Sequence, residues 1–166
     1  MSRVAGWMAG RIGGTVTALL LALPSGTGPY DMALAPGPVA PGARGSARLV
    51  FAESPFGVAA TADGHLRYEI RITAQGLPAP ASLGSYHAFV AWEVSADLKE
   101  WTRLGVVANG VSTVGVATLN KFLLVIAAEA DSGVDHHAGP TVLHGSSPST
   151  WLQRFLNHPM FRGAPG

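Results

Sequence analysis

The sequence predicts an all-β fold: an immunoglobulin-like antiparallel β-sandwich of seven to eight strands, followed by one short C-terminal helix. The first observation is a series of short runs, rich in β-branched and aromatic residues and separated by turn residues, between residues 48 and 144. The second is polar–apolar alternation within these runs. The third is composition: with 48% hydrophobic and 13% charged residues, a chain of 166 residues is suited to one folded domain.

Each predicted strand has its own pattern. We expect strands at residues 48–52, 56–61, 66–73, 86–95, 101–107, 113–118, 122–128 and 141–144. The run 66–73 alternates most clearly, which predicts one buried and one solvated face. The run 122–128 is apolar on both faces, as in a central strand. Asn109-Gly110 is a dipeptide typical of primed hairpin turns.

In the strand 86–95, the large side chains fall on one parity. We expect an inward face and an outward face that carries His87, Glu93 and Ser95. The inward set is Tyr86, Ala88, Val90, Trp92 and Val94.

The N-terminal residues predict export. A positively charged start precedes the apolar run 12–23, so residues 1–23 resemble a secretory signal peptide or, if retained, an N-terminal anchor that associates with the membrane. Residues 24–45 are rich in proline and glycine and are predicted to be a linker. The sandwich domain is then expected at 46–145, outside the cytoplasm: in the periplasm, at the cell surface or secreted.

Residues 146–166 are predicted to form a helix and a tail. Ser147 suits the N-cap and Pro148 the first helical position. Trp151, Leu152 and Phe155 share one apolar stripe of this helix. The stripe either packs on an open edge or face of the sandwich or binds a partner protein or a membrane surface. Trp101, at the start of a strand, either supports the core or anchors a second contact surface.

A family resemblance covers roughly residues 86–145. Trp92, the pair Leu104-Gly105, the strand that ends at Glu129 and the segment 139–145 resemble the extracytoplasmic domain of anti-sigma-K-type factors. The resemblance implies an immunoglobulin-like sandwich in an extracytoplasmic setting. This chain departs from those factors because a signal-like leader stands where they carry a sigma-binding helical domain and a membrane helix.

Four of the six histidines lie after residue 135, which raises metal binding as a second hypothesis. Imidazole and thioether ligands suit copper, but these residues match no standard ligand spacing. The residues that would serve are His136, His137, His144, His158 and Met160.

The functional expectation is a non-enzymatic module. A net charge of +1 without a basic stripe gives no electrostatic case for nucleic acid, and no G-x-S-x-G motif indicates a serine nucleophile. We expect a partner-binding or structural subunit of a cell-envelope assembly, without a cofactor. Its contact residues would be Trp101, Trp151, Leu152 and Phe155. The alternative is a periplasmic accessory protein that handles copper or another metal.

Overall fold

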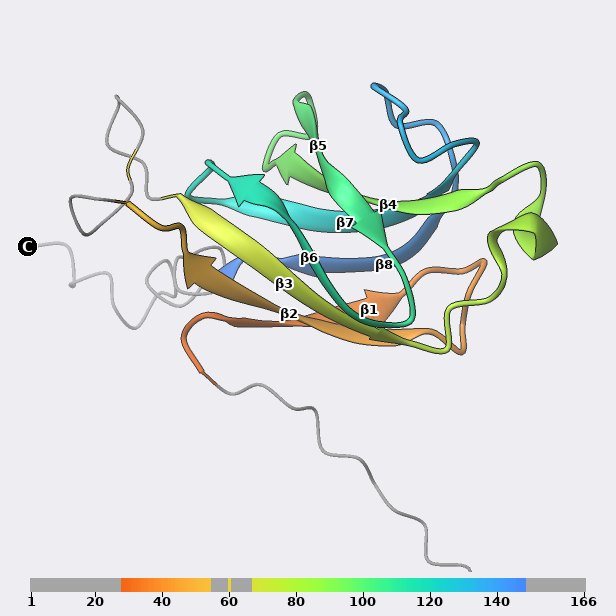
Figure 1. Cartoon of the computed structure of the whole chain (residues 1–166), viewed down its shortest axis with the longest axis horizontal. Helices are drawn as coiled ribbons and strands as arrows, with labels where there is room; N and C mark the ends of the chain where they lie inside the picture. The colour runs from red at the N-terminus through yellow and green to blue at the C-terminus, as the bar shows by residue number, and fades with distance from the viewer. Residues whose placement is uncertain (1–27, 55–59, 61–66, 149–166) are drawn as a thin grey trace, which may run out of the picture.

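The computed structural model describes residues 28–54, 60 and 67–148, and these residues confirm the all-β prediction. Figure 1 shows the strands arranged around one interior. Buried apolar side chains from all eight strands form one core cluster there. The strands are β1 (Asp31–Pro36), β2 (Arg44–Phe51), β3 (Tyr68–Gln75), β4 (Ala88–Ser95), β5 (Trp101–Val107), β6 (Gly110–Ala117), β7 (Phe122–Glu129) and β8 (Thr141–Ser146), with one 3-10 turn, η1 (Pro80–Leu83).

The strands form one antiparallel sheet in the order β5-β4-β7-β8-β1-β2-β3-β6. We call this eight-stranded sheet the ladder. The two outer strands of this order, β5 and β6, lie side by side in space, so the ladder nearly closes into a barrel. Their approach needs a glycine: a Cβ on Gly115 would stand 2.7 Å from the carbonyl oxygen of Leu104. The finer prediction of an immunoglobulin-like sandwich is not confirmed, because the pairings join all eight strands rather than two separate sheets.

The prediction that residues 24–45 form a linker is wrong for the two segments that β1 and the start of β2 occupy. β1 pairs with β2 through its first residues and with β8 through Ala35 and Pro36. Its alternate residues Met32 and Leu34 are buried in the core. The composition of the segment concealed a strand of six residues, because its alternation is short and proline and glycine flank it.

The interior of the ladder holds the main core. As predicted, the apolar face of the strand 66–73 points inward: Ile70 and Ile72 are fully buried in β3. β7 lies between β4 and β8 and is buried on both faces, which confirms its prediction as a central strand.

β4 is buried on both faces, and its orientation is opposite to the prediction. Phe89 and Ala91 belong to the interior cluster, whereas Val90, Trp92 and Val94 form a second cluster on the outer face. Glu93, predicted to face solvent, is 1% exposed. It lies on the parity of Phe89 and Ala91.

The Glu93 carboxylate holds the turn between β6 and β7. Its Oε1 accepts hydrogen bonds from the backbone N–H groups of Thr118 (3.0 Å) and Leu119 (2.8 Å). Burial raises the pKa of this carboxyl, and the two backbone hydrogen bonds oppose that shift. Alternation alone predicts that Glu93 faces solvent, but these backbone hydrogen bonds let its carboxylate be buried.

The Asn109-Gly110 turn also differs from its prediction. Gly110 has a positive φ, but Asn109 does not, so this is not the primed turn in which both central residues have positive φ. The Asn109 side chain instead accepts a hydrogen bond from the Leu77 N–H and donates one to the Leu77 carbonyl, each at 2.9 Å. This asparagine therefore ties the β5–β6 turn to the segment before η1.

The leader at 1–23 and the predicted helix with its tail, from residue 149 onward, lie outside the described residues. Among the residues that the structure describes, no helix is long and apolar enough to cross a membrane.

Candidate functional site

The candidate site begins with the second apolar cluster, on the outer face of β4 and β7. Strand faces of this kind are apolar enough to need a cover, because exposed apolar area is unfavourable in water. The segment 130–140, which joins β7 to β8, packs over the cluster through Val134. The buried members are Ala88, Val90, Trp92, Val94, Val125 and Ala127.

Glu129, the last residue of β7, holds this covering loop. Its side chain is buried, at 2% exposure, and its Oε1 lies 3.0 Å from Nδ1 of His137. Its Oε2 accepts hydrogen bonds from the backbone N–H groups of Ala138 (3.3 Å) and Gly139 (3.1 Å). A carboxylate that collects several donors tolerates burial, and it fixes the position of every group that donates to it.

Further contacts anchor the loop at its other end. The guanidinium of Arg103, on β5, donates a hydrogen bond to the Ser132 carbonyl, and Asp131 accepts one from the Gly133 N–H. Near the return to β8, a Cβ on Gly139 would stand 1.5 Å from the Ala128 carbonyl oxygen. Only glycine therefore fits at this point, where the loop lies directly against β7.

An imidazole between two indoles forms the centre of the site. The ring of His137 stacks on Trp101 with centroids 4.2 Å apart and planes 6° from parallel. Trp92 meets the same imidazole edge-on, at 6.0 Å and 64°. The Trp92 Nε1–H is buried and has no hydrogen-bond partner among the described residues. The three rings therefore hold one another in a defined orientation.

The turn between β4 and β5 places Trp101. The hydroxyl of Ser95 donates to Asp97 and accepts from the Glu100 N–H, and the indole Nε1–H of Trp101 donates to the Leu98 carbonyl at 3.1 Å. The Ser95 hydroxyl is also the main reason that the pKa of the Asp97 carboxyl is lowered. Leu98 has φ 63°, a left-handed conformation that is rare for a leucine. The turn thus holds a strained backbone that orients the indole.

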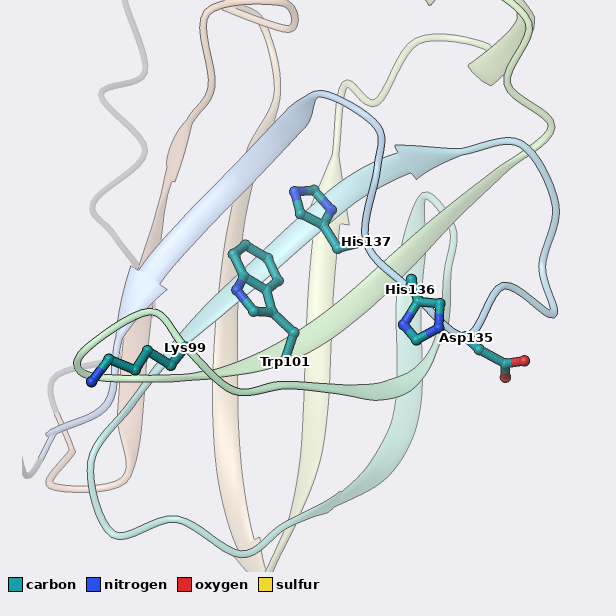
Figure 2. A pocket seen from close by; sticks show the side chains of 5 residues that line it. All are labelled: Lys99, Trp101, Asp135, His136 and His137. Carbon is teal, nitrogen blue, oxygen red and sulfur yellow. The ribbon is translucent and has the colours of Figure 1, made fainter.

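A shallow pocket of about 300 Å³ opens beside these rings (Figure 2). Lys99 lies on the β4–β5 turn, whereas Asp135 and His136 come from the covering loop. The Lys99 ammonium also lies 3.3 Å from an oxygen of Asp97, and both side chains are well exposed. The pocket is lined by Lys99, Trp101, Asp135, His136 and His137, so it presents a flat aromatic surface between charges of opposite sign.

The structure brings together some of the residues that the sequence singled out. Trp101, His136 and His137 line the same pocket. His144 lies on β8, opposite Val125 in the ladder, and its side chain is exposed. Trp101 is half-buried and packs against the outer cluster, so it supports a core and borders a pocket at once.

The remaining predicted contact residues, Trp151, Leu152 and Phe155, lie outside the described residues, as do His158 and Met160. Within the part of the chain that the structure describes, no three His, Cys, Asp or Glu side chains are grouped to hold a metal ion. Metal binding by the histidines stays a prediction.

Sequence reasoning missed the role of Glu129. It noted this residue only as a carboxylate at a strand end. The available signal was a charged residue that closes an otherwise apolar strand, eight positions before a histidine in a glycine-flanked loop. Such a carboxylate can turn back and accept hydrogen bonds from the loop that follows it.

Comparisons with protein-family models, with curated proteins and with solved structures found no match to this chain.

Proposed function

We propose that this chain is an exported, non-enzymatic binding module that recognises a partner protein of a cell-envelope assembly. Recognition would use the pocket lined by Lys99, Trp101 and the loop residues 135–137. The observation that carries the proposal is the parallel stack of Trp101 on His137, held from beneath by the buried Glu129.

A preformed stack favours binding because little side-chain freedom is left to lose. Immobilising a side chain at an interface costs about 0.5–1.5 kcal/mol, and the hydrogen bond to Glu129 already restricts His137. Tryptophan is also the residue type most enriched among interface hot spots. A site with its aromatic centre already ordered would therefore bind more tightly than a mobile surface of equal area.

The shape and charge of the pocket favour a protein surface over a small ligand. Small-molecule sites are deep and largely enclosed, whereas this pocket is shallow and open. Lys99 and Asp135 lie at its rim with opposite charges, and exposed rim charges typically guide the orientation and rate of protein association. The partner surface would present an apolar or aromatic side chain to Trp101 and charges of both signs around it.

The chemistry of the pocket supports a non-enzymatic role. A histidine hydrogen-bonded to a buried carboxylate is the orienting pair of many hydrolases, in which the histidine activates a nearby hydroxyl or thiol. Among the residues that the structure describes, the pocket lining offers no serine, threonine or cysteine beside His137. We propose instead that Glu129 and His137 fix the aromatic surface. We also propose that the domain is related to immunoglobulin-like domains and lies outside the cytoplasm, as the resemblance to anti-sigma-K-type factors implies.

Site-specific photo-crosslinking in intact producing cells tests the proposal. A photoreactive amino acid at Lys99 or His136 should give the same adduct mass, recovered in the cell-envelope fraction. Trp101→Ala should reduce that adduct at least about tenfold, because it removes a hot-spot side chain worth more than 1.4 kcal/mol.

The matched control is the photoreactive residue at Val111, which is 67% exposed and lies on β6, outside this pocket. Equal adduct yields from positions 99, 136 and 111, or yields that Trp101→Ala leaves unchanged, would contradict the assigned surface.

A further inference from the structure

A second aromatic cluster lies at one end of the ladder, apart from the pocket. The rings of Tyr30 and Phe51 meet edge-on at 5.4 Å, and Tyr68 lies 5.2 Å from Phe51 and 6.3 Å from Tyr30. Tyr30 is 43% exposed and Phe51 is 42% exposed, so both are exposed large apolar side chains although their rings contact each other. We call these three residues the end cluster.

The end cluster continues the interior of the ladder. Phe51 pairs with Tyr68 across β2 and β3, and two residues further along the same face Leu49 pairs with Ile70, both buried in the core. Tyr30 precedes β1 on the parity of the buried Met32. The three rings are therefore the next row of the core, beyond the last row that the described residues cover.

The chain leaves the ladder at this same end. β8 is antiparallel to β1, so it finishes where β1 begins, and a Cβ on Gly145 would touch the Ala33 carbonyl oxygen at 2.6 Å. In Figure 1 the arrowheads of β2 and β8 and the start of β3 lie together. The last described residues, 147 and 148, thus follow β8 on the side of the end cluster. The sequence after them carries the apolar residues Trp151, Leu152, Phe155 and Leu156.

We propose that the C-terminal segment 149–166 docks its Trp151–Phe155 stripe onto the end cluster of its own chain. From β8 to β3 is three strand spacings, or roughly 14 Å. Phe155 lies seven residues after Pro148, a span of about 10 Å as a helix and about 25 Å when extended. As a helix the stripe therefore reaches Tyr30 and Phe51, and when extended it also reaches Tyr68.

The physical reason is that each surface needs the other. A helix of about ten residues is marginal in water unless its apolar face is buried. The end cluster offers inward-facing aromatic rings, and aromatic pairs contribute about 0.5–1.5 kcal/mol beyond their buried area. The occupant is attached to the chain, so its effective concentration is in the millimolar range and exceeds that of a second copy or of a separate partner.

Disulfide trapping tests the docking directly, because the full chain has no cysteine to interfere. The test variant is Phe51→Cys/Phe155→Cys. The control is Val111→Cys/Phe155→Cys, because Val111 is exposed and pairs with Thr73, toward the opposite end of β3. Both are treated with diamide at low protein concentration and examined by non-reducing electrophoresis and intact mass.

We expect an intramolecular disulfide in the 51–155 variant, formed at least about tenfold faster than in the 111–155 control. Circular dichroism of the reduced proteins verifies that both variants keep their β-sheet signal. Equal rates in the two variants would show that the segment does not dock. A 51–155 disulfide between two chains would assign the end cluster to a second copy. Either outcome overturns the proposal, and neither bears on the pocket of Trp101.

Discussion

Two apolar surfaces lie beyond the main core, and they differ in how far the described residues cover them. The outer face of β4 and β7 is covered by the loop 130–140, whereas the end cluster of Tyr30, Phe51 and Tyr68 is left partly exposed by the described residues. The covering loop places one apolar side chain, Val134, against its cluster. Apolar complementarity alone does not account for this difference.

The difference lies in polar anchoring. A loop that crosses an apolar face must satisfy its backbone N–H groups without water, and each unsatisfied buried group costs about 1–3 kcal/mol. The Glu129 carboxylate accepts hydrogen bonds from the backbone N–H groups of Ala138 and Gly139 and forms one with Nδ1 of His137. Beside the end cluster, the Asp31 carboxylate accepts hydrogen bonds from the Gly28 N–H and from Arg48, so it holds the start of β1 and not a covering loop. A segment that covers it would have to rely on its own helical hydrogen bonds, which the predicted C-terminal helix supplies.

The strongest way to break this contrast is Glu129→Ala. The substitution leaves two backbone N–H groups and the imidazole of His137 without their acceptor, so we expect the free energy of unfolding to fall by about 2–4 kcal/mol. Urea denaturation measures the loss. Glu100→Ala, at an exposed position on the neighbouring turn, should stay within about 0.5 kcal/mol of the parent chain. Equal effects of the two substitutions would mean that the loop does not depend on the carboxylate.

Glu93 provides a pH-dependent comparison with Glu129, because both carboxylates are buried and both hold a turn. Burial raises the folded-state pKa of Glu93 above its usual value of 4.5. A raised pKa means that the folded state binds the proton more tightly. The stabilising contribution of Glu93 to the free energy of unfolding is therefore fully present below pH 4.5. It is lost as pH rises through the folded-state pKa.

In Glu93→Gln this pH-dependent loss is absent, so the variant should gain stability relative to the parent chain between pH 4 and pH 8. Urea denaturation across that range measures the difference, with Glu100→Gln as the exposed control. A parent-to-variant difference that does not change with pH would contradict the assignment.

The smallest expected effect concerns the end cluster. Phe51→Ser in the full chain should lower the free energy of unfolding by about 1–2 kcal/mol, because the ring contacts both tyrosines. If the C-terminal segment docks there, Phe51→Ser and Phe155→Ser should be non-additive by about 0.5–1 kcal/mol in a double-mutant cycle. Val111→Ser with Phe155→Ser gives the additive control. Additive values for both pairs would leave the end cluster without a C-terminal occupant.

Much of the fold could be predicted from local patterns. The alternation in β3 and the continuous apolar run of β7 indicated their burial correctly, since both depend only on period-two spacing. β1 could not be recognised, because its alternation spans only six residues within a proline- and glycine-rich stretch. A strand this short is identified by its pairing with β2 and β8, which are distant in sequence.

The candidate site shows the same division. Trp101, His136 and His137 each stood out as residue types, but their meeting depends on β4 pairing with both β5 and β7. That pairing places the start of β5 and the loop after β7 over one face of β4. Glu129 acquired its role only from the path of that loop. These pairings link residues far apart in the chain, and no local spacing encodes them.

By itself, the sequence determined that the chain builds antiparallel strands and which of their positions are apolar, because side-chain alternation is a property of the extended backbone. Only the tertiary structure decided which apolar face of β4 is interior. Both faces of that strand are buried, one by the ladder and one by a loop, and alternation distinguishes two faces without indicating which one points inward. The same ambiguity applies to Glu93. Its charge predicted a position in solvent, but hydrogen bonds from the Thr118 and Leu119 backbone allow its carboxylate to be buried.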